Sequence, residues 1–221
     1  MRENKNIRIL SEKKIQMKKY KNIVFDVGGV LSGYKFEQVM HEKYGAEKGR
    51  TEKLVKIMGA DEIWCEFDLE NYNFYEVVEL FAQKFTDDAD FIREIFSHMA
   101  EYADPYYDVW DLVHELKKVG YKVYLLSNYS SLTFKWQLGD GYFLKDVDGY
   151  LFSHEIHEIK PHPIIYQKFF EKNGLNPSEC LFFDDRLINV EGSRAMGMDS
   201  IHVISKDFLI EQLNELIEMA K

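Results

Sequence analysis

An aspartate stands at the end of an apolar run near the start of the chain. In the stretch NIVFDVGGVL, residues 22–31, Asp26 follows three apolar residues and precedes Val27, Gly28 and Gly29. Because the two glycines have no side chains, backbone N–H groups beside them can approach an anion closely. A carboxylate next to such a turn could act as a nucleophile toward the phosphorus of a bound phosphate group.

Further polar residues border other apolar runs. Ser127 and Asn128 follow YKVYLL, Asp184 and Asp185 follow CLFF, and Lys160 lies in EIKPHPIIY. Carboxylates at the ends of two buried strands would repel each other without a cation, and a site built only of oxygen ligands suits Mg²⁺. A hydroxyl, amide donors and a lysine charge are what a phosphate dianion requires. Each residue alone could be a cap or a surface residue, but together they predict a magnesium-dependent phosphate site.

These residues need a scaffold that brings strand ends together. From Pro105 onward, strand-like runs alternate with helical patterns. Strands are expected at 121–128, 149–153, 180–185 and 200–204. Helices are expected at 106–120 and 163–174, and two more are expected to end at Ala195 and at Met219. This alternation predicts a parallel sheet with helices on both faces, in which sites form at the carboxyl ends of the strands. We therefore expect an α/β fold whose three-layer, Rossmann-like core comprises residues 21–33 and 105–221.

Between the two parts of this core, the pattern is helical and charged. Apolar residues recur at helical spacing in 36–45, 50–59, 73–85 and 90–102, and no strand is visible there. We expect an inserted all-helical cap domain over 34–104. The basic residues 1–20 form a separate N-terminal tail, interpreted as a solvated leader before the first strand rather than as a binding arm.

Composition limits the classes of protein that this chain can represent. The 221 residues are 46% hydrophobic, enough for one core with a small accessory domain. The net charge of −10 argues against nucleic acid as a partner, and neither a membrane span nor a signal peptide is visible. Cys65 and Cys180 are interpreted as reduced thiols, so we expect a cytoplasmic protein. The oligomeric state is not indicated.

Four segments, in this order, resemble the four motifs of the haloacid dehalogenase-like (HAD) hydrolase superfamily, over about residues 21–205. They are FDVGGVL, LLSN, IKPHPIIY and FFDDRLINVEG. The resemblance implies that Asp26 is the nucleophile and that Lys160 assists catalysis. It also implies Mg²⁺ bound by Asp26, the Gly28 carbonyl, Asp184 and Asp185, with support from Asn189, and phosphate bound by Val27, Gly28, Gly29, Ser127, Asn128 and Lys160.

One expected residue is missing. The superfamily's first motif usually has a second aspartate two residues after the nucleophile, where it serves as general acid and base, and this sequence has Gly28 there. Such help is worth roughly 10²–10⁴-fold in rate. The protein could therefore be an inactive phosphometabolite-binding relative, a slow phosphatase, or an enzyme for substrates whose leaving oxygen is already acidic. A glycine here is similar to the bacterial glucose-1-phosphate phosphatase group, which favours a sugar phosphate as substrate.

A carboxylate of the cap could replace the missing aspartate. The segment ADEIWCEFDLE supplies five candidates, although solvated surface charges are the simpler interpretation: Asp61, Glu62, Glu66, Asp68 and Glu70. The dehalogenase branch of the superfamily also lacks the second aspartate, but it needs no metal and has no paired carboxylate like Asp184–Asp185. We therefore expect a Mg²⁺-dependent phosphomonoester hydrolase that acts on a small phosphorylated metabolite through an aspartyl-phosphate at Asp26.

Two other groups of residues have more than one interpretation. Three histidines, His154, His157 and His162, could form a zinc site, although their spacing fits no standard set and loop positions are simpler. The cap is rich in aromatic residues, which either form its own small core or face the site and stack on a sugar. These residues are Trp64, Phe67, Tyr72, Phe74 and Tyr75.

Overall fold

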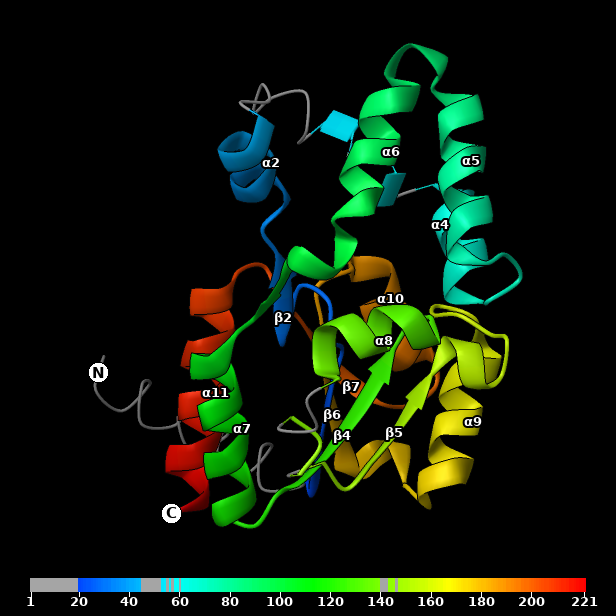
Figure 1. Cartoon of the computed structure of the whole chain (residues 1–221). Coiled ribbons are helices and arrows are strands. Elements are labelled where there is room, and N and C mark those ends of the chain that lie inside the picture. Colours follow the sequence, from blue (N-terminus) through cyan, green and yellow to red (C-terminus); the bar gives the residue numbers. More distant parts are fainter. Residues whose placement is uncertain are drawn as a thin grey trace, which may run out of the picture.

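The computed structural model describes residues 20–44, 53–54, 56, 58–59, 61–139, 143–145 and 147–221. Nearly all of the expected N-terminal tail and about half of the helix expected over 50–59 lie outside these residues. The described part of the chain forms a sheet with helices on both sides and a group of helices above one edge (Figure 1).

The central sheet has five parallel strands in the order β5-β4-β1-β6-β7, as the alternating pattern predicted. Its strands are β1 (Asn22–Phe25), β4 (Lys122–Ser127), β5 (Gly149–Phe152), β6 (Cys180–Asp184) and β7 (Asp199–His202). Strand β1 is central and buried along its whole length. A parallel strand covered on both faces must be apolar throughout, which explains its unbroken Ile-Val-Phe run.

Helices cover both faces of the sheet (Figure 1). On one face lie α7 (Tyr107–Lys118) and α11 (Lys206–Ala220), and on the other α9 (Pro163–Asn173) and α10 (Leu187–Ala195). Successive β1 side chains point to opposite faces, so Phe25 packs in the cluster that contains Trp110 of α7, whereas Val24 packs in the cluster that contains Tyr166 of α9. The predicted three-layer α/β core is confirmed.

Among the elements that the structure describes, four helices share a core of their own and lie above the carboxyl ends of the strands (Figure 1). They are α2 (Phe36–Tyr44), α4 (Glu62–Asp68), α5 (Phe74–Lys84) and α6 (Ala89–Ser97). Phe67, Phe81 and Phe96 are buried at their centre. These helices occupy the position expected of a cap, while the exact domain boundaries stay a prediction.

Three elements were not expected from the sequence. A short antiparallel pair, β2 (Ser32–Tyr34) and β3 (Ala103–Pro105), joins the cap to the core. Helix α8 (Ser131–Leu138) follows β4, with its N-terminus capped by Ser130, whose side chain accepts the Thr133 N–H at 3.1 Å. Strands of three residues are too short to show a period, and the apolar residues of α8 lie on no single side. Helix α4, by contrast, lies within the segment predicted as an all-helical cap.

Short 3₁₀ turns complete the structure: η1 (Thr86–Asp88), η2 (Met99–Glu101), η3 (Ser153–Glu155) and η4 (Pro177–Glu179). Cys65 and Cys180 are both free, as expected of reduced thiols. Within the described ranges, no helix has both the length and the apolar character needed to cross a bilayer.

Candidate active site

The strand register brings two predicted site residues to one edge of the sheet. Phe25 pairs with Leu125 of β4 and Phe183 of β6, so the residues that follow them lie side by side. The Asp26 N–H donates to the Phe183 carbonyl at 2.9 Å, which places Asp26 next to Asp184. The two carboxylates therefore lie next to each other, as expected, and their shared role as metal ligands stays a prediction.

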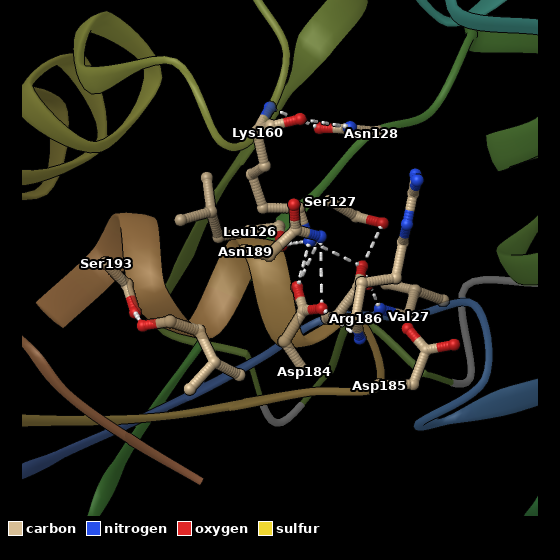
Figure 2. A network of polar contacts seen from close by, with 12 residues as sticks. Val27, Leu126, Ser127, Asn128, Lys160, Asp184, Asp185, Arg186, Asn189 and Ser193 are labelled. Atoms are coloured by element: carbon tan, nitrogen blue, oxygen red, sulfur yellow. Dashed lines mark hydrogen bonds and ion pairs between the residues drawn. The ribbon is translucent and has the colours of Figure 1, made fainter. Parts of the chain in front are cut away.

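Lys160 lies between these carboxylates, and Figure 2 shows its side chain extending toward Asp184. Its Nζ is 3.0 Å from Asp26 Oδ1 and 2.7 Å from Asp184 Oδ2, and it donates to the Leu126 carbonyl at 3.0 Å. The lysine is 2% exposed, so its ammonium group exchanges water for these three acceptors. The two carboxylates raise the pKa of Lys160 above its ordinary value even though burial lowers it. Lys160 therefore carries a fixed positive charge at this edge of the sheet.

Donors on one oxygen fix the orientation of Asp26. Its Oδ1 accepts the Ser127 hydroxyl at 2.5 Å and the Val27 N–H at 2.7 Å, in addition to the contact with Lys160 (Figure 2). Burial raises the pKa of Asp26 above its ordinary value, more than Lys160 lowers it, and Asp184 raises it further. A single lysine thus does not balance the buried negative charge, which is the condition that favours a second cation.

Asp184 is held by the start of α10. The Arg186 N–H donates to its Oδ1 at 2.8 Å, and Asn189 Nδ2 lies 3.0 and 3.1 Å from its two oxygens. Carboxylate oxygens of Asp26, Asp184 and Asp185 all lie within 4.8 Å of one another. The other amide atom, Asn189 Oδ1, is buried and accepts no hydrogen bond from any described residue. Three carboxylates and an unpaired amide oxygen are hard oxygen donors that fit Mg²⁺ and its coordinated waters.

The glycine turn serves a different purpose from the one expected at Gly29. Its N–H donates to the Ser32 carbonyl at 2.8 Å, so this group is already engaged and does not face an anion. Gly29 has φ +73°, and a Cβ there would lie 2.5 Å from Asp185 Oδ2. Glycine is therefore required because the turn is left-handed and because Asp185 packs directly against it. Gly28 lines the pocket described below, and its contact with phosphate stays a prediction.

Asn128 is also engaged within the protein. Its Oδ1 accepts the Lys160 N–H at 2.8 Å, and its Nδ2 donates to the Lys160 carbonyl at 3.1 Å (Figure 2). This reciprocal pair joins the end of β4 to the loop that carries the lysine. The Asn128 side chain thus positions Lys160. Asn128 also lines the pocket described below, and its contact with phosphate stays a prediction.

A pocket of about 250 Å³ opens between this site and the cap. Its floor includes Asp26, Gly28, Lys160 and Asp185. The cap side is mostly apolar and consists of Phe36, Met58, Trp64, Ile95, Phe96 and Met99. Asp68, one of the five cap carboxylates considered as a substitute acid, also lines the pocket. Further polar lining residues, which sequence reasoning did not assign to the site, are Tyr34, Tyr129, Thr133 and Arg186. Tyr129 and Arg186 directly follow predicted site residues in the chain, which is the signal that could have indicated them.

The three histidines form no common cluster: two contact backbone carbonyls, and His162 Nδ1 lies 3.3 Å from Glu158 Oε2. His154 Nδ1 is 2.6 Å from the Tyr129 carbonyl, and His157 Nδ1 is 2.7 Å from the Leu69 carbonyl. In the described part of the chain, the aspartates above are the one group placed to hold a metal ion.

The five aromatic residues considered in the cap lie in three different environments. Phe67 and Phe74 pack in the cap core, Tyr72 and Tyr75 are exposed, and Trp64 lines the pocket. One of the five is therefore placed to contact a substrate.

Comparison with known proteins agrees with the motifs. A family model described as haloacid dehalogenase-like hydrolase matches residues 20–197. The chain therefore belongs to the haloacid dehalogenase-like hydrolases. The narrower resemblance to glucose-1-phosphate phosphatases stays a prediction.

Curated relatives with similar sequences are named as phosphatases. A phosphatase of Mycobacterium tuberculosis is 39% identical over 98 residues, 44% of this chain and 45% of the relative. The pyrophosphatase PpaX of Bacillus cereus is 24% identical over 132 residues, 54% of this chain and 61% of the relative. A sesquiterpene phosphatase of Aspergillus oryzae is 22% identical over 209 residues, 90% of this chain and 97% of the relative. The matches thus span about half of the first two relatives and nearly all of the third.

Solved structures share the fold at low sequence identity. A dehalogenase solved as an intermediate complex superposes with a TM-score of 0.69 at 19% identity, covering 84% of this chain and 85% of the other. An enzyme of this family from Bacteroides thetaiotaomicron, solved as an Asp-to-Ala mutant with magnesium and inorganic phosphate, gives 0.60 at 22% identity, covering 83% and 93%. These neighbours include a dehalogenase and an enzyme solved with magnesium and inorganic phosphate. The fold alone therefore does not distinguish dehalogenation from phosphate hydrolysis.

Proposed function

We propose that this protein is a Mg²⁺-dependent phosphomonoester hydrolase with Asp26 as its nucleophile. The observation that carries the proposal is the meeting of Asp26, Asp184 and Asp185 within 4.8 Å, with Lys160 bridging the first two. A haloacid dehalogenase needs no such cluster, whereas phosphoryl transfer requires a cation to balance its charges. The phosphatase names of the relatives support the same choice.

Some residues of the site orient the nucleophile, and others supply charge. Ser127 and the Val27 N–H hold Asp26 Oδ1 and so aim the carboxylate into the pocket. Lys160 supplies a positive charge beside the attacked phosphorus, and Asn128 holds the lysine loop in place. Mg²⁺ bound by Asp26, Asp184 and Asp185, together with the Gly28 carbonyl, would polarise the phosphoryl group. Attack by Asp26 on phosphorus would form an aspartyl-phosphate that water then hydrolyses.

The pocket lining bears on the substrate class. A sugar phosphate, favoured by the resemblance to glucose-1-phosphate phosphatases, would need several hydrogen-bonding partners on the cap side. The cap contributes six apolar residues there, and its polar contributions include Tyr34 and Asp68. One relative that aligns over nearly its whole length is named a sesquiterpene phosphatase. We therefore propose a small organic phosphate whose leaving group is largely apolar, and treat sugar phosphates as the alternative.

A phosphate-release screen tests this proposal. The panel contains 4-nitrophenyl phosphate, hexyl phosphate, geranyl monophosphate and glucose 1-phosphate, each with Mg²⁺ and with EDTA. We expect Mg²⁺-dependent release that is abolished in Asp26→Asn and is faster with the apolar esters. Phosphate binding without turnover of any ester would instead favour the non-catalytic relative. Chloride release from 2-chloropropionate without a metal would favour the dehalogenase.

A further inference from the structure

The turn after Asp26 leaves the leaving group without its usual proton donor. Position 28 is a glycine, and the nearest atom to a Cβ built there is the Tyr129 hydroxyl, 3.4 Å away. Alkoxide leaving groups depart slowly unless they are protonated. A group elsewhere in the pocket must therefore supply the proton if the enzyme acts on alkyl phosphates.

The structure separates the five carboxylates of the cap segment. Asp61 accepts the Ile63 N–H at the start of α4 and pairs with Lys84, so its role is structural. Glu62 is exposed, and Glu66 accepts a hydrogen bond from the Asn71 side chain at the surface. None of these three lines the pocket.

Of the five cap carboxylates, Asp68 alone lines the pocket that contains the site. It is 6% exposed and lines the same pocket as Asp26, Gly28 and Lys160. Burial raises the pKa of its carboxyl group well above the ordinary value, and the charge of Asp26 raises it further, against opposing effects of Lys160 and Arg186. This shift of the pKa favours the protonated form of the carboxyl group, which is the form that a proton donor requires.

Other groups near Asp68 do not compete for this role. A hydrogen bond from the Ser130 N–H favours its ionised form, but burial outweighs it. Tyr34, Cys65 and Tyr129 also lie within reach of its charge. Burial raises the pKa of the Tyr129 hydroxyl well above its ordinary value, which makes it a weaker acid than an ordinary tyrosine.

Contacts with the core hold this end of α4 in place. The Asp68 carbonyl accepts the Ser153 hydroxyl at 2.6 Å, and Glu70 Oε1 accepts the Ser131 N–H at 2.7 Å. Glu70 has φ +57°, a left-handed conformation that side chains rarely adopt, and it is maintained where its carboxylate meets the start of α8. The cap is thus joined to the core at Asp68 and two residues after it, which restrains the end of α4 that carries this pocket-lining side chain.

We propose that Asp68 is the general acid and base of this enzyme and replaces the aspartate missing at position 28. This inference rests on the proposed phosphatase function. As Asp26 attacks phosphorus and the P–O bond to the leaving group breaks, the Asp68 carboxyl proton moves to the departing oxygen. The resulting Asp68 carboxylate then takes a proton from water while the water oxygen attacks phosphorus. This second step releases inorganic phosphate, restores the Asp26 carboxylate and leaves Asp68 protonated.

Leaving-group dependence distinguishes this role from a structural one. We compare wild type, Asp68→Asn and the control Glu62→Gln, an exposed position on the same helix, with 4-nitrophenyl phosphate and hexyl phosphate. Hexanolate needs a proton, so Asp68→Asn should lower kcat/KM for hexyl phosphate by roughly 10²–10⁴-fold. Nitrophenolate needs none, so this variant should still release about one equivalent of nitrophenolate in a burst, followed by slow turnover because the base of the second step is lost.

Folding and binding are measured on the same proteins. A carboxyl group whose pKa is raised in the folded state loses stabilising free energy as pH rises through that pKa, and an amide does not. Asp68→Asn should therefore melt no lower than wild type at pH 8 and should still bind inorganic phosphate with Mg²⁺. Glu62→Gln should match wild type in every assay.

Three outcomes would refute these ideas, and they can be told apart. Equal loss on both esters, or loss of phosphate binding in Asp68→Asn, would assign Asp68 a structural role. A leaving-group-dependent loss in Tyr129→Phe but not in Asp68→Asn would move the acid to the tyrosine. Wild-type protein that hydrolyses neither ester, although it binds phosphate, would refute the proposed function itself.

Discussion

Replacement of Lys160 by methionine tests the electrostatic account of the site most directly. Methionine keeps an unbranched stem beside Phe182, whose ring centroid lies 5.2 Å from the lysine Nζ, but removes the charge. Asp26 and Asp184 then lose a partner at 3.0 and 2.7 Å while both stay buried. Removing one partner of a buried ion pair costs about 3–5 kcal/mol, because a buried charge is left uncompensated.

This cost predicts a measurable change in thermal unfolding. For a chain of this length, 1 kcal/mol corresponds to roughly 2–4 °C in melting temperature, so we expect a decrease of roughly 6–20 °C in Lys160→Met. The control is Lys168→Met, where an exposed lysine pairs with Glu171 at 2.9 Å and the change should stay within about 0.5 kcal/mol. Both variants are compared with wild type by calorimetry in EDTA and in Mg²⁺.

The pH dependence has a defined sign. Lys160 lowers the pKa of Asp26, so its removal lets that pKa rise further above the ordinary value. A raised carboxyl pKa in the folded state means that stability is lost as pH increases, so the deficit of Lys160→Met should be larger at pH 8 than at pH 5. Mg²⁺ should restore part of it by replacing the missing charge. A variant that melts with wild type in EDTA at pH 8 would show that the carboxylates are not held by this lysine.

Three further changes test other parts of the site. Gly29→Ala should weaken Mg²⁺ binding in calorimetric titrations, because its Cβ would displace Asp185. The control Gly120→Ala, at φ +103° and in open space, should only cost about 1–2 kcal/mol of stability. Equal Mg²⁺ affinity in both variants would contradict the packing argument. Asn128→Ala removes two hydrogen bonds to the Lys160 backbone, each worth about 0.5–1.5 kcal/mol. This variant should lower kcat more than it raises KM. An unchanged kcat would show that the lysine loop needs no such support. Mg²⁺ at 100 times its Kd should raise the free energy of unfolding by about 2.7 kcal/mol over EDTA, and the absence of any shift in melting temperature would count against a metal site.

Much of the core could be predicted because its signals are local. Strand β1 is apolar throughout since both of its faces are covered, and the runs before Ser127 and Asp184 have the same character. Once such strands are parallel neighbours, the polar residues at their ends must meet at one edge. The convergence of Asp26, Asp184 and Lys160 therefore follows from the order of segments along the chain.

Other features depended on contacts that no local pattern encodes. Nothing in the sequence indicates that the Gly29 N–H is engaged by Ser32, or that Asn128 binds the backbone of Lys160. Helix α8 has apolar residues on more than one side, because Leu132 and Trp136 pack against the cap and Phe134 packs against the core, so it lacks the one-sided pattern of a surface helix. These outcomes are decided by neighbours that are far apart in the chain.

The sequence by itself determined that the second motif aspartate is missing and that five cap carboxylates are available to replace it. Only the tertiary structure decided among them, because α4 contacts the core near Ser131 and Ser153, distant in sequence from both Asp68 and Asp26. Helical periodicity states which residues share a side of a helix, but not which partner that side meets. The choice of Asp68 is therefore a property of how the cap sits on the core.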